Sequence, residues 1–434
     1  MRFLFIHQNM PAQYAHLVQH FAKDSKNDVV FVTRRQKLEI PGVRKIRYDL
    51  QRAPRLDSHR YVRVLDEQLL YGQAVVRSCL ELKESGWTPD IICVHSGWGE
   101  GLFLKDVYPD VPVLNFSEYY YHGTGADVGF GGEEVDIDRL CRTRMRNIHL
   151  LMSMEAADWN VTPTRFQWEQ MPAAYKPRTS IIHDGVRTNI CVPNPDVRVP
   201  LPDGSVVTRD DEVVTYLARN LERYRGFDVF MRALPLIQKA RPNAQIIVVG
   251  GDDTSYGSKP SNYPNWREKM QAEIRFDPDR VHFVGRVPYS HYLQILQVSR
   301  VHMYLTFPFV LSWSLLESMS IGCTIVASDT PPLHEAITDD ETGVLVDFFD
   351  HEALCARICE LLDDPERRAR LGAAARDFAV RTYDLDTVCL PQHLELIERV
   401  RTGALPRFSS TATEDGFPGA PPAAPQPGTA ASAE

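Results

Sequence analysis

The stretch Val213-Val-Thr-Tyr-Leu-Ala-Arg219-Asn-Leu-Glu-Arg-Tyr-Arg225-Gly226-Phe227 sets the character of the second half of this 434-residue chain. An apolar run that ends near Arg219 is typical of a buried strand, and the spacing over Phe227–Ala240 predicts a helix. Gly226 frees the backbone just before that helix, whose N-terminus favours anions. We therefore expect Arg219 and Arg225 to clamp a diphosphate from two sides. An arginine-rich surface loop is the other interpretation.

Outward from this turn, short apolar runs alternate with segments of helical spacing. The expected strands of the second half are Val213–Arg219, Gln245–Val249, Val281–Val284, Val301–Thr306, Thr324–Ser328 and Gly343–Asp347. The expected helices are Phe227–Ala240, Ser290–Gln297, Ser314–Ile321, Glu352–Leu362 and Pro365–Thr382. Strands joined by helices predict a parallel sheet that is covered on both faces.

The first half shows the same alternation. Its expected strands are Arg2–His7, Val29–Thr33, Ile91–His95, Val111–Phe116 and Trp159–Thr162, with helices at Gln13–Ala22 and Val62–Leu82. The sequence therefore predicts an α/β fold of two doubly wound, Rossmann-like domains that face a cleft, at 1–190 and 212–382. A linker at 191–211 separates them. Residues 402–434 are rich in Ala, Pro, Gly, Ser and Thr, which predicts a disordered tail.

Composition excludes several classes of protein. Hydrophobic residues make up 44% and charged residues 24% of the chain, which is typical of a globular protein. No apolar run reaches the roughly 18 residues that a membrane-spanning helix requires. The net charge of −9 argues against nucleic-acid binding. Eight scattered cysteines without a Cys-x-x-Cys pair indicate a reduced, cytoplasmic setting.

The charge is uneven along the chain. Between Arg34 and Arg63 stand ten basic and three acidic residues, which leaves a local charge of +7. This basic segment is either a solvated surface or a patch that meets an anionic membrane or a phosphorylated acceptor. Peripheral contact with the inner face of the membrane is therefore one expectation.

Gly250-Gly-Asp252-Asp253 follows another expected strand. Paired glycines at a strand end allow a ligand or neighbouring backbone to approach closely. Two adjacent aspartates are weak evidence for a metal, so we expect a metal-free loop.

The segment Thr306-Phe-Pro-Phe-Val-Leu-Ser312-Trp-Ser314-Leu-Leu-Glu317 leads from a strand into a helix. Ser312 or Ser314 can cap this helix and leave its first backbone N–H groups free for a phosphate. Glu317 stands among apolar residues, where a lone carboxylate is costly unless a partner such as a ribose hydroxyl satisfies it. An exposed helical glutamate is the alternative interpretation.

These motifs stand in a recognisable order. Arg219–Arg225-Gly226 is followed by Gly-Gly-Asp at 250–252, Val-Gly-Arg-Val at 284–287, Leu-Leu-Glu-Ser-Met-Ser-Ile-Gly at 315–322, Pro-Leu-His-Glu-Ala-Ile at 332–337 and Glu-Thr-Gly-Val-Leu-Val at 341–346. The set resembles the retaining glycosyltransferases of family 4. The motifs around His95 and Glu118 are similar to a subgroup found among bacterial glycan-building enzymes. The resemblance covers nearly all of residues 1–400.

The resemblance implies the two-domain architecture called GT-B, with the nucleotide-sugar donor on the C-terminal domain and the acceptor mainly on the N-terminal one. It implies that Arg219 and Arg225 neutralise the diphosphate without a metal cofactor, and that Glu317 accepts hydrogen bonds from the ribose. The other residues expected at the donor are Gly250, Gly285, Arg286, Ser312, Ser314 and Leu315. The helix at 383–401 is expected to cross back to the first domain.

One departure from the family concerns the donor sugar. The family usually carries two glutamates eight positions apart, and Phe309 replaces the first of them. Val310-Leu-Ser-Trp and Pro331-Pro332 also stand where glycines are common. Because the first glutamate is generally assigned to the sugar, its loss leaves the sugar and part of the catalytic machinery open.

The candidates for the acceptor side are His95, Glu118 and His122, which fall at or just after strand ends that face the predicted cleft. His122 precedes Gly123-Thr-Gly125, a loop that can close over an acceptor. A structural role in hydrogen bonding or aromatic packing is the alternative for each of them.

The leading hypothesis is retaining transfer of a hexose-type unit from a nucleotide-diphosphate sugar to a glycan or lipid-linked acceptor in polysaccharide biosynthesis. A sugar-nucleotide epimerase of the same architecture is a second hypothesis. A catalytically silent, nucleotide-sugar-binding partner of another transferase is a third, which the substitution at Phe309 supports.

Overall fold

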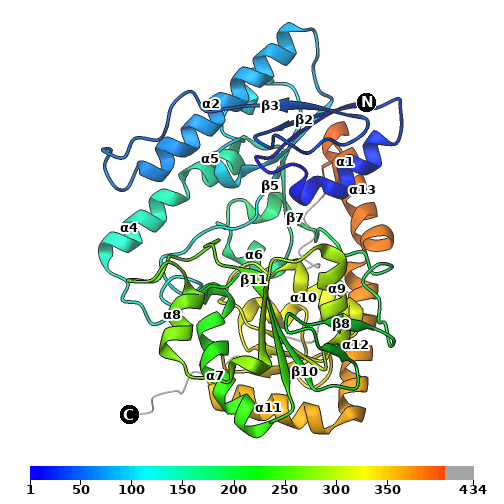
Figure 1. Ribbon diagram of the computed structural model, residues 1–434. Coiled ribbons are helices and arrows are strands. Elements are labelled where there is room, and N and C mark those ends of the chain that lie inside the picture. Colours follow the sequence, from blue (N-terminus) through cyan, green and yellow to red (C-terminus); the bar gives the residue numbers. More distant parts are fainter. Residues whose placement is uncertain (406–434) are drawn as a thin grey trace, which may run out of the picture.

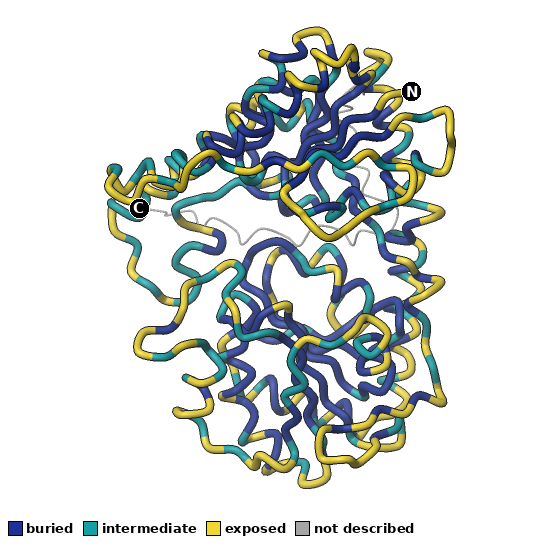
Figure 2. Tube along the Cα trace, turned by 45° about the horizontal axis from the view of Figure 1, so that its top comes forward, coloured by how far each residue is buried: buried dark blue, intermediate teal, exposed yellow. Residues whose placement is uncertain are grey.

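The computed structural model describes residues 1–405, and the predicted tail lies outside these residues from position 406 onward. Two lobes stand one above the other in Figure 1, and Figure 2 shows that the buried residues gather around a sheet in each lobe. Both large sheets consist of parallel strands with helices on their faces. The predicted α/β class with two doubly wound units is confirmed.

The N-terminal sheet has seven parallel strands in the order β3-β2-β1-β4-β5-β6-β7. They are β1 (Arg2–Ile6), β2 (Asp28–Thr33), β3 (Val43–Arg47), β4 (Ile91–His95), β5 (Val113–Phe116), β6 (Trp159–Thr162) and β7 (Thr179–Ile181). The apolar pattern does not reveal β3, because this edge strand lies in the basic segment and none of its residues is fully buried.

Helices cover both faces of this sheet. They are α1 (Ala15–Ala22), α2 (Arg63–Glu84), α3 (Leu104–Val107), α4 (Ile137–Arg146), α5 (Ile148–Ala156) and α6 (Arg165–Gln170). Phe3 and Phe5 of β1 pack in the core that contains α1, whereas Leu4 and Ile6 pack in the core that contains α2. Alternate residues of one strand thus serve two cores, as a strand buried on both faces requires.

The C-terminal sheet has six parallel strands in the order β12-β11-β10-β13-β14-β15. They are β10 (Val213–Asn220), β11 (Gln245–Gly251), β12 (Val281–Gly285), β13 (Val301–Tyr304), β14 (Ile325–Ser328) and β15 (Val344–Val346). The helices are α7 (Phe227–Ala240), α8 (Trp266–Glu273), α9 (Tyr289–Val298), α10 (Trp313–Ile321), α11 (His351–Asp363) and α12 (Pro365–Tyr383). Each expected strand and helix of this half is present, and α8 is an addition that buries only Met270.

A small antiparallel hairpin, β8 (Arg198–Pro200) with β9 (Val206–Thr208), stands within the predicted linker at 191–211. Val199 and Val207 pack into a core of the C-terminal lobe. The predicted linker is therefore folded onto that lobe.

The end of the described chain returns to the first lobe. A π-helix, η7 (Leu385–Cys389), follows α12 and leads into α13 (Leu390–Thr402). Figure 1 shows α13 beside α1, and its Leu396 and Val400 join the core that contains Phe3. The two places where the chain passes between lobes are tied together, because Leu385 N–H donates to the Val186 carbonyl at 2.8 Å.

Candidate active site

The basic turn after β10 lies at the carboxyl edge of the C-terminal sheet. It consists of the short helix η4 (Arg223–Arg225), which Gly226 closes in a left-handed conformation with a φ of 66°. A Cβ on Gly226 would lie 2.4 Å from Leu305 Cβ, so glycine is required there. Arg219 is exposed, and its guanidinium has no protein partner among residues 1–405. This arginine is therefore available to an anion.

Arg225 differs from Arg219 because its side chain is buried. Its guanidinium donates hydrogen bonds to Thr306 Oγ1 at 2.7 Å and to the Val310 carbonyl at 3.0 Å, and it lies over the ring of Tyr256. The two-sided clamp stays a prediction. Arg225 Nη1 and Nη2 already donate to Thr306 and Val310, so this arginine is fixed to its own lobe.

The segment before α10 is held by the Tyr304 hydroxyl, which accepts a hydrogen bond from the Ser312 N–H at 2.8 Å. Ser312 is the N-cap of α10, and its side chain accepts a hydrogen bond from the Ser314 N–H at 3.3 Å, so the predicted cap is present. Leu315 is fully buried, and its N–H donates to the Ser312 carbonyl at 3.1 Å. The N–H groups of these three residues therefore already have partners. Free N–H donors at the start of α10, where Trp313 is the first residue, stay a prediction.

Glu317 projects from α10 and is half-buried. Its carboxylate accepts hydrogen bonds from the Tyr289 hydroxyl at 2.7 Å and from the Tyr292 hydroxyl. Burial, and after it the charge of Glu317, raises the pKa of both tyrosines, which keeps them protonated as donors. The carboxylate thus has the partners that its surroundings require, namely two tyrosines of α9, and its role toward a ribose stays a prediction.

The end of β11 lies close to neighbouring backbone of its own lobe. A Cβ on Gly250 would lie 2.7 Å from Leu221 Cδ2 and 2.9 Å from the Ala218 carbonyl. Gly250 therefore makes room for neighbouring chain, which is one of the two expectations for this position. The buried carboxylate of Glu222, which the sequence pattern did not single out, accepts N–H hydrogen bonds from residues 255–257 at 3.0–3.3 Å.

The two adjacent aspartates after β11, Asp252 and Asp253, each form an ion pair with an arginine. Asp252 pairs with Arg267 at 2.7 Å and Asp253 pairs with Arg286 at 2.8 Å. Arg286, which follows the left-handed Gly285, also donates to Asn220 Oδ1 at 2.7 Å. Within residues 1–405, no three His, Cys, Asp or Glu side chains are grouped to hold a metal ion.

Phe309 occupies an aromatic cluster between the lobes. Its ring centroid lies 4.5 Å from that of Tyr119, 5.1 Å from Tyr256 and 5.5 Å from Tyr224. Tyr119 comes from the N-terminal lobe, and its hydroxyl donates to the Pro308 carbonyl at 3.3 Å. With 4% of its surface exposed, Phe309 packs the lobes together and presents no polar group.

On the facing lobe, the structure brings Glu118 and His95 together, with 3.6 Å between Glu118 Oε2 and His95 Nε2. Gln13 Nε2 donates to Glu118 Oε1 at 3.3 Å, and Gln13 Oε1 lies 3.0 Å from His7 Nε2. The sequence did not single out His7 and Gln13 as acceptor-side residues. His7 directly follows β1, and a search for polar residues after strand ends would have found it. The Glu118 side chain is 35% exposed and His95 is fully buried, so the carboxylate is the accessible member of this cluster.

His122 does not join this cluster. Its Nε2 lies 2.7 Å from the Gln170 carbonyl, and its ring packs against Tyr120. The glycine loop at 123–125 leads into a segment that contacts the C-terminal lobe, where Asp127 accepts a hydrogen bond from Tyr224 at 2.9 Å.

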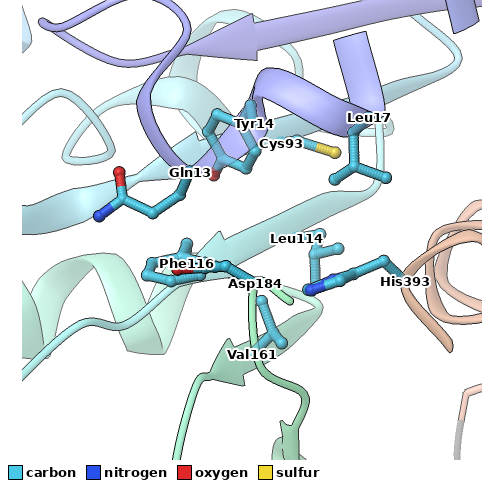
Figure 3. Close-up of a pocket in the computed structure, with 9 residues that line it drawn as sticks. All are labelled: Gln13, Tyr14, Leu17, Cys93, Leu114, Phe116, Val161, Asp184 and His393. Atoms are coloured by element: carbon cyan, nitrogen blue, oxygen red, sulfur yellow. The ribbon is translucent and has the colours of Figure 1, made fainter. Parts of the chain in front are cut away.

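A small pocket lies close to the acceptor-side cluster (Figure 3). It is lined by Gln13, Tyr14, Leu17, Cys93, Leu114, Phe116, Val161, Asp184 and His393. Its volume of about 10 Å³ corresponds to one water molecule, so it does not accommodate a sugar. Asp184 accepts a hydrogen bond from Trp313 Nε1 at 2.9 Å, and burial raises the pKa of Asp184 to about 7.

Two family models match this chain. The model described as Glycosyl transferase family 4 group matches residues 25–191, and the model described as Glycosyl transferases group 1 matches residues 203–378. The chain therefore belongs to the group 1 glycosyltransferases of family 4, as its motifs predicted.

Curated relatives are about a quarter identical to this chain over the regions that match. The GDP-mannose-dependent alpha-(1-6)-phosphatidylinositol monomannoside mannosyltransferase of Mycolicibacterium smegmatis is 25% identical over 59% of this chain and 65% of the relative. The D-inositol 3-phosphate glycosyltransferase of Acidothermus cellulolyticus is 27% identical over 59% of this chain and 57% of the relative. The chain thus spans less than two thirds of the length of each relative.

Solved structures confirm the fold. Sucrose-phosphate synthase from Thermosynechococcus elongatus superposes with a TM-score of 0.69 and 20% identity, over 93% of this chain and 100% of that one. Anabaena Alr3699/HepE in complex with UDP gives a TM-score of 0.63 and 14% identity, over 91% of this chain and 99% of that one. The architecture of the two lobes is GT-B.

Proposed function

We propose that this protein transfers a hexose-type unit from a nucleotide-diphosphate sugar to a glycan or lipid-linked acceptor with retention of configuration. The observation that carries the proposal is the exposed guanidinium of Arg219 at the carboxyl edge of the C-terminal sheet, which has no partner among residues 1–405. Helix α10, which carries Glu317, begins at the same edge. A free arginine at this edge suits the diphosphate. The names of the relatives point the same way, since one uses GDP-mannose and HepE was solved with UDP-glucose.

Arg219 is the residue that we assign to neutralisation of the leaving diphosphate, a task that a divalent cation performs in other transferases. We therefore propose a reaction that needs no metal. Glu317 remains our candidate for the ribose, with Tyr289 and Tyr292 orienting its carboxylate. A ribose hydroxyl would then share an acceptor that these tyrosines already hold in place.

On the acceptor side, Glu118 is the group that we assign to an acceptor hydroxyl. It is partly exposed, while its neighbours His95 and His7 are buried. A carboxylate held by Gln13 accepts hydrogen bonds from hydroxyl groups, which fits a sugar or polyol acceptor.

One observation favours a second candidate function, a silent partner that binds a nucleotide-sugar without transferring it. Phe309 stands where the family usually has a glutamate, and its ring is enclosed by tyrosines of both lobes. Loss of a polar group at that position would remove part of the catalytic machinery.

We propose a cytoplasmic location with peripheral contact to an anionic membrane. Within residues 1–405, no helix combines the length and apolar character needed to cross a bilayer. In the basic segment, Lys45, Arg47, Arg52 and Arg60 pair with acids. The remaining six cations are exposed without an ion pair in the described chain: Arg34, Arg35, Lys37, Arg44, Arg55 and Arg63. These six cations are the groups that would meet the lipid.

The experiment that tests the function is a donor panel. The full chain is mixed with UDP-, GDP- and ADP-sugars, and binding is scored by the rise in melting temperature. Release of nucleoside diphosphate is then measured with and without lipid and glycan acceptors, in buffer with a chelator. We expect release that depends on the acceptor and continues in the chelator. Binding without release would favour the silent partner, and absence of binding throughout the panel would overturn both functions.

A further inference from the structure

A glycine-rich segment of the N-terminal lobe, residues 126–133, reaches across to the C-terminal lobe, and we name it the strap. The centroid of the Phe130 ring lies 5.0 Å from that of Phe307, 5.2 Å from Phe348 and 5.3 Å from Phe349. Those three residues belong to the C-terminal lobe, and Phe130 packs against its core. The strap is therefore anchored in the lobe to which it does not belong.

The polar contacts of the strap meet the basic turn η4. Glu133 Oε1 lies 3.0 Å from Arg223 Nη1, and the Gly131 carbonyl accepts a hydrogen bond from Arg223 Nη2 at 2.8 Å. Asp127 Oδ2 accepts a hydrogen bond from the Tyr224 hydroxyl at 2.9 Å. The two residues that precede Arg225 are thus both held by the other lobe.

The path of the strap depends on glycine. A Cβ on Gly131 would lie 2.7 Å from Glu133 Oε1 and 2.8 Å from Arg223 Nη2, so the ends of these two flexible side chains would have to shift. Gly129 and Gly132 have φ angles of 83° and 81°, which few other residues adopt without strain. With no side chain at Gly131, its backbone carbonyl and the Glu133 carboxylate both contact the guanidinium of Arg223.

We propose that the strap is a positioning element for the basic turn, so that binding of a nucleotide diphosphate on the C-terminal lobe depends on residues of the N-terminal lobe. The proposal rests on the proposed function, because it takes Arg219 and the adjoining turn as the diphosphate site. The strap residues act through Arg223 and Tyr224, which in turn set the position of Arg225.

The test compares Glu133→Gln with Glu134→Gln. Glu134 is exposed and makes no ion pair within residues 1–405, so it is the matched control. Isothermal calorimetry on the full chain uses UDP and GDP as probes. We expect Glu133→Gln to weaken nucleotide affinity about threefold to tenfold, because it loses a charge-assisted contact, and Glu134→Gln to leave the affinity unchanged. Phe130→Leu, a milder change than Phe130→Ala, should weaken affinity in the same direction.

Hydrogen exchange of the unliganded protein supplies a second readout. Amides at 223–227 should exchange faster in Glu133→Gln and Phe130→Leu, while those of β4 keep the rate of the wild type. Unchanged exchange and unchanged affinity in both variants would overturn the proposal. If the wild type binds neither UDP nor GDP, the proposed function fails, whereas the exchange rates at 223–227 still decide whether the strap positions the turn.

Discussion

The Asp184 carboxylate accepts a hydrogen bond from the Trp313 indole N–H at 2.9 Å, although Asp184 lies between the lobes and Trp313 opens helix α10. The second carboxylate oxygen, Oδ1, is buried and has no hydrogen-bond partner in the described chain. One oxygen is thus desolvated without compensation. This is the physical reason why the pKa of Asp184 is raised from 3.8 to about 7.

We predict that Asp184→Asn stabilises the protein above neutral pH. The raised pKa means that the folded state binds this proton more tightly than the unfolded chain, so stability falls as the pH rises from about 4 to 7 and stays low above that. Asparagine keeps an acceptor for Trp313 and removes the charge. Urea titrations from pH 5 to 9 should show that the free energy of unfolding of the variant exceeds that of the wild type by about 1–3 kcal/mol above pH 7. If the free energy of unfolding changed with pH in the same way for the variant and the wild type, the raised pKa of Asp184 would be contradicted.

We predict that Arg219→Ala weakens nucleotide binding alone, whereas Arg225→Ala weakens nucleotide binding and also destabilises the fold. Arg219 has no protein partner in residues 1–405, so its loss should weaken UDP or GDP binding by roughly 1.5–3 kcal/mol without changing the melting temperature. Arg225→Ala leaves Thr306 and the Val310 carbonyl without their donor, so it should also lower the free energy of unfolding by about 1.5–3 kcal/mol. Calorimetry and denaturant titration of both variants measure the two quantities. If both variants lowered the free energy of unfolding by the same amount, the proposed difference between Arg219 and Arg225 would be refuted.

Restoring the family's residue with Phe309→Glu is predicted to destabilise the protein. The change removes a buried ring from the cluster with Tyr119 and Tyr256 and places a carboxylate among aromatic rings. The free energy of unfolding should fall by about 3–5 kcal/mol, whereas Phe309→Leu should cost less than about 1.5 kcal/mol. Urea titration checks both values. A stable Phe309→Glu variant with faster transfer would show that the aromatic packing is dispensable.

Binding to anionic vesicles is predicted to depend on the unpaired cations of the basic segment. Flotation should require anionic lipid and should weaken as salt rises from about 0.05 to 0.5 M, since screening shortens the reach of each charge. Arg35→Ala combined with Lys37→Ala should reduce flotation, because both residues are exposed and unpaired in the described chain. Arg47→Ala, which removes a cation already paired with Asp49, is the control. Equal flotation on neutral vesicles would reject the membrane contact.

Most of the fold was predictable because buried parallel strands are continuous apolar runs and the helices between them are long. Helix α7 begins at Phe227 and ends at Ala240, as its apolar spacing predicts. The pattern fails where an element is short or exposed. Strand β3 has no fully buried residue and α8 buries only Met270, so neither carries a periodic apolar signal.

The candidate site was predictable only where a residue follows a strand end. That rule placed Arg219 at one sheet edge and brought His95 and Glu118 together at the other. It could not reveal that Tyr256 covers Arg225, because such contacts depend on how loops pack in three dimensions. Contacts between lobes join residues far apart in the sequence, and no local pattern records them.

Helix α13 has a consequence for biosynthesis. Leu396 and Val400 complete the core around Phe3, so the N-terminal lobe lacks one wall of this core until α13 has been synthesised. Phe21, which shares that core, is left uncovered in the meantime. Because α13 follows the whole C-terminal lobe in the chain, the core of the N-terminal lobe is completed only after that lobe has been synthesised.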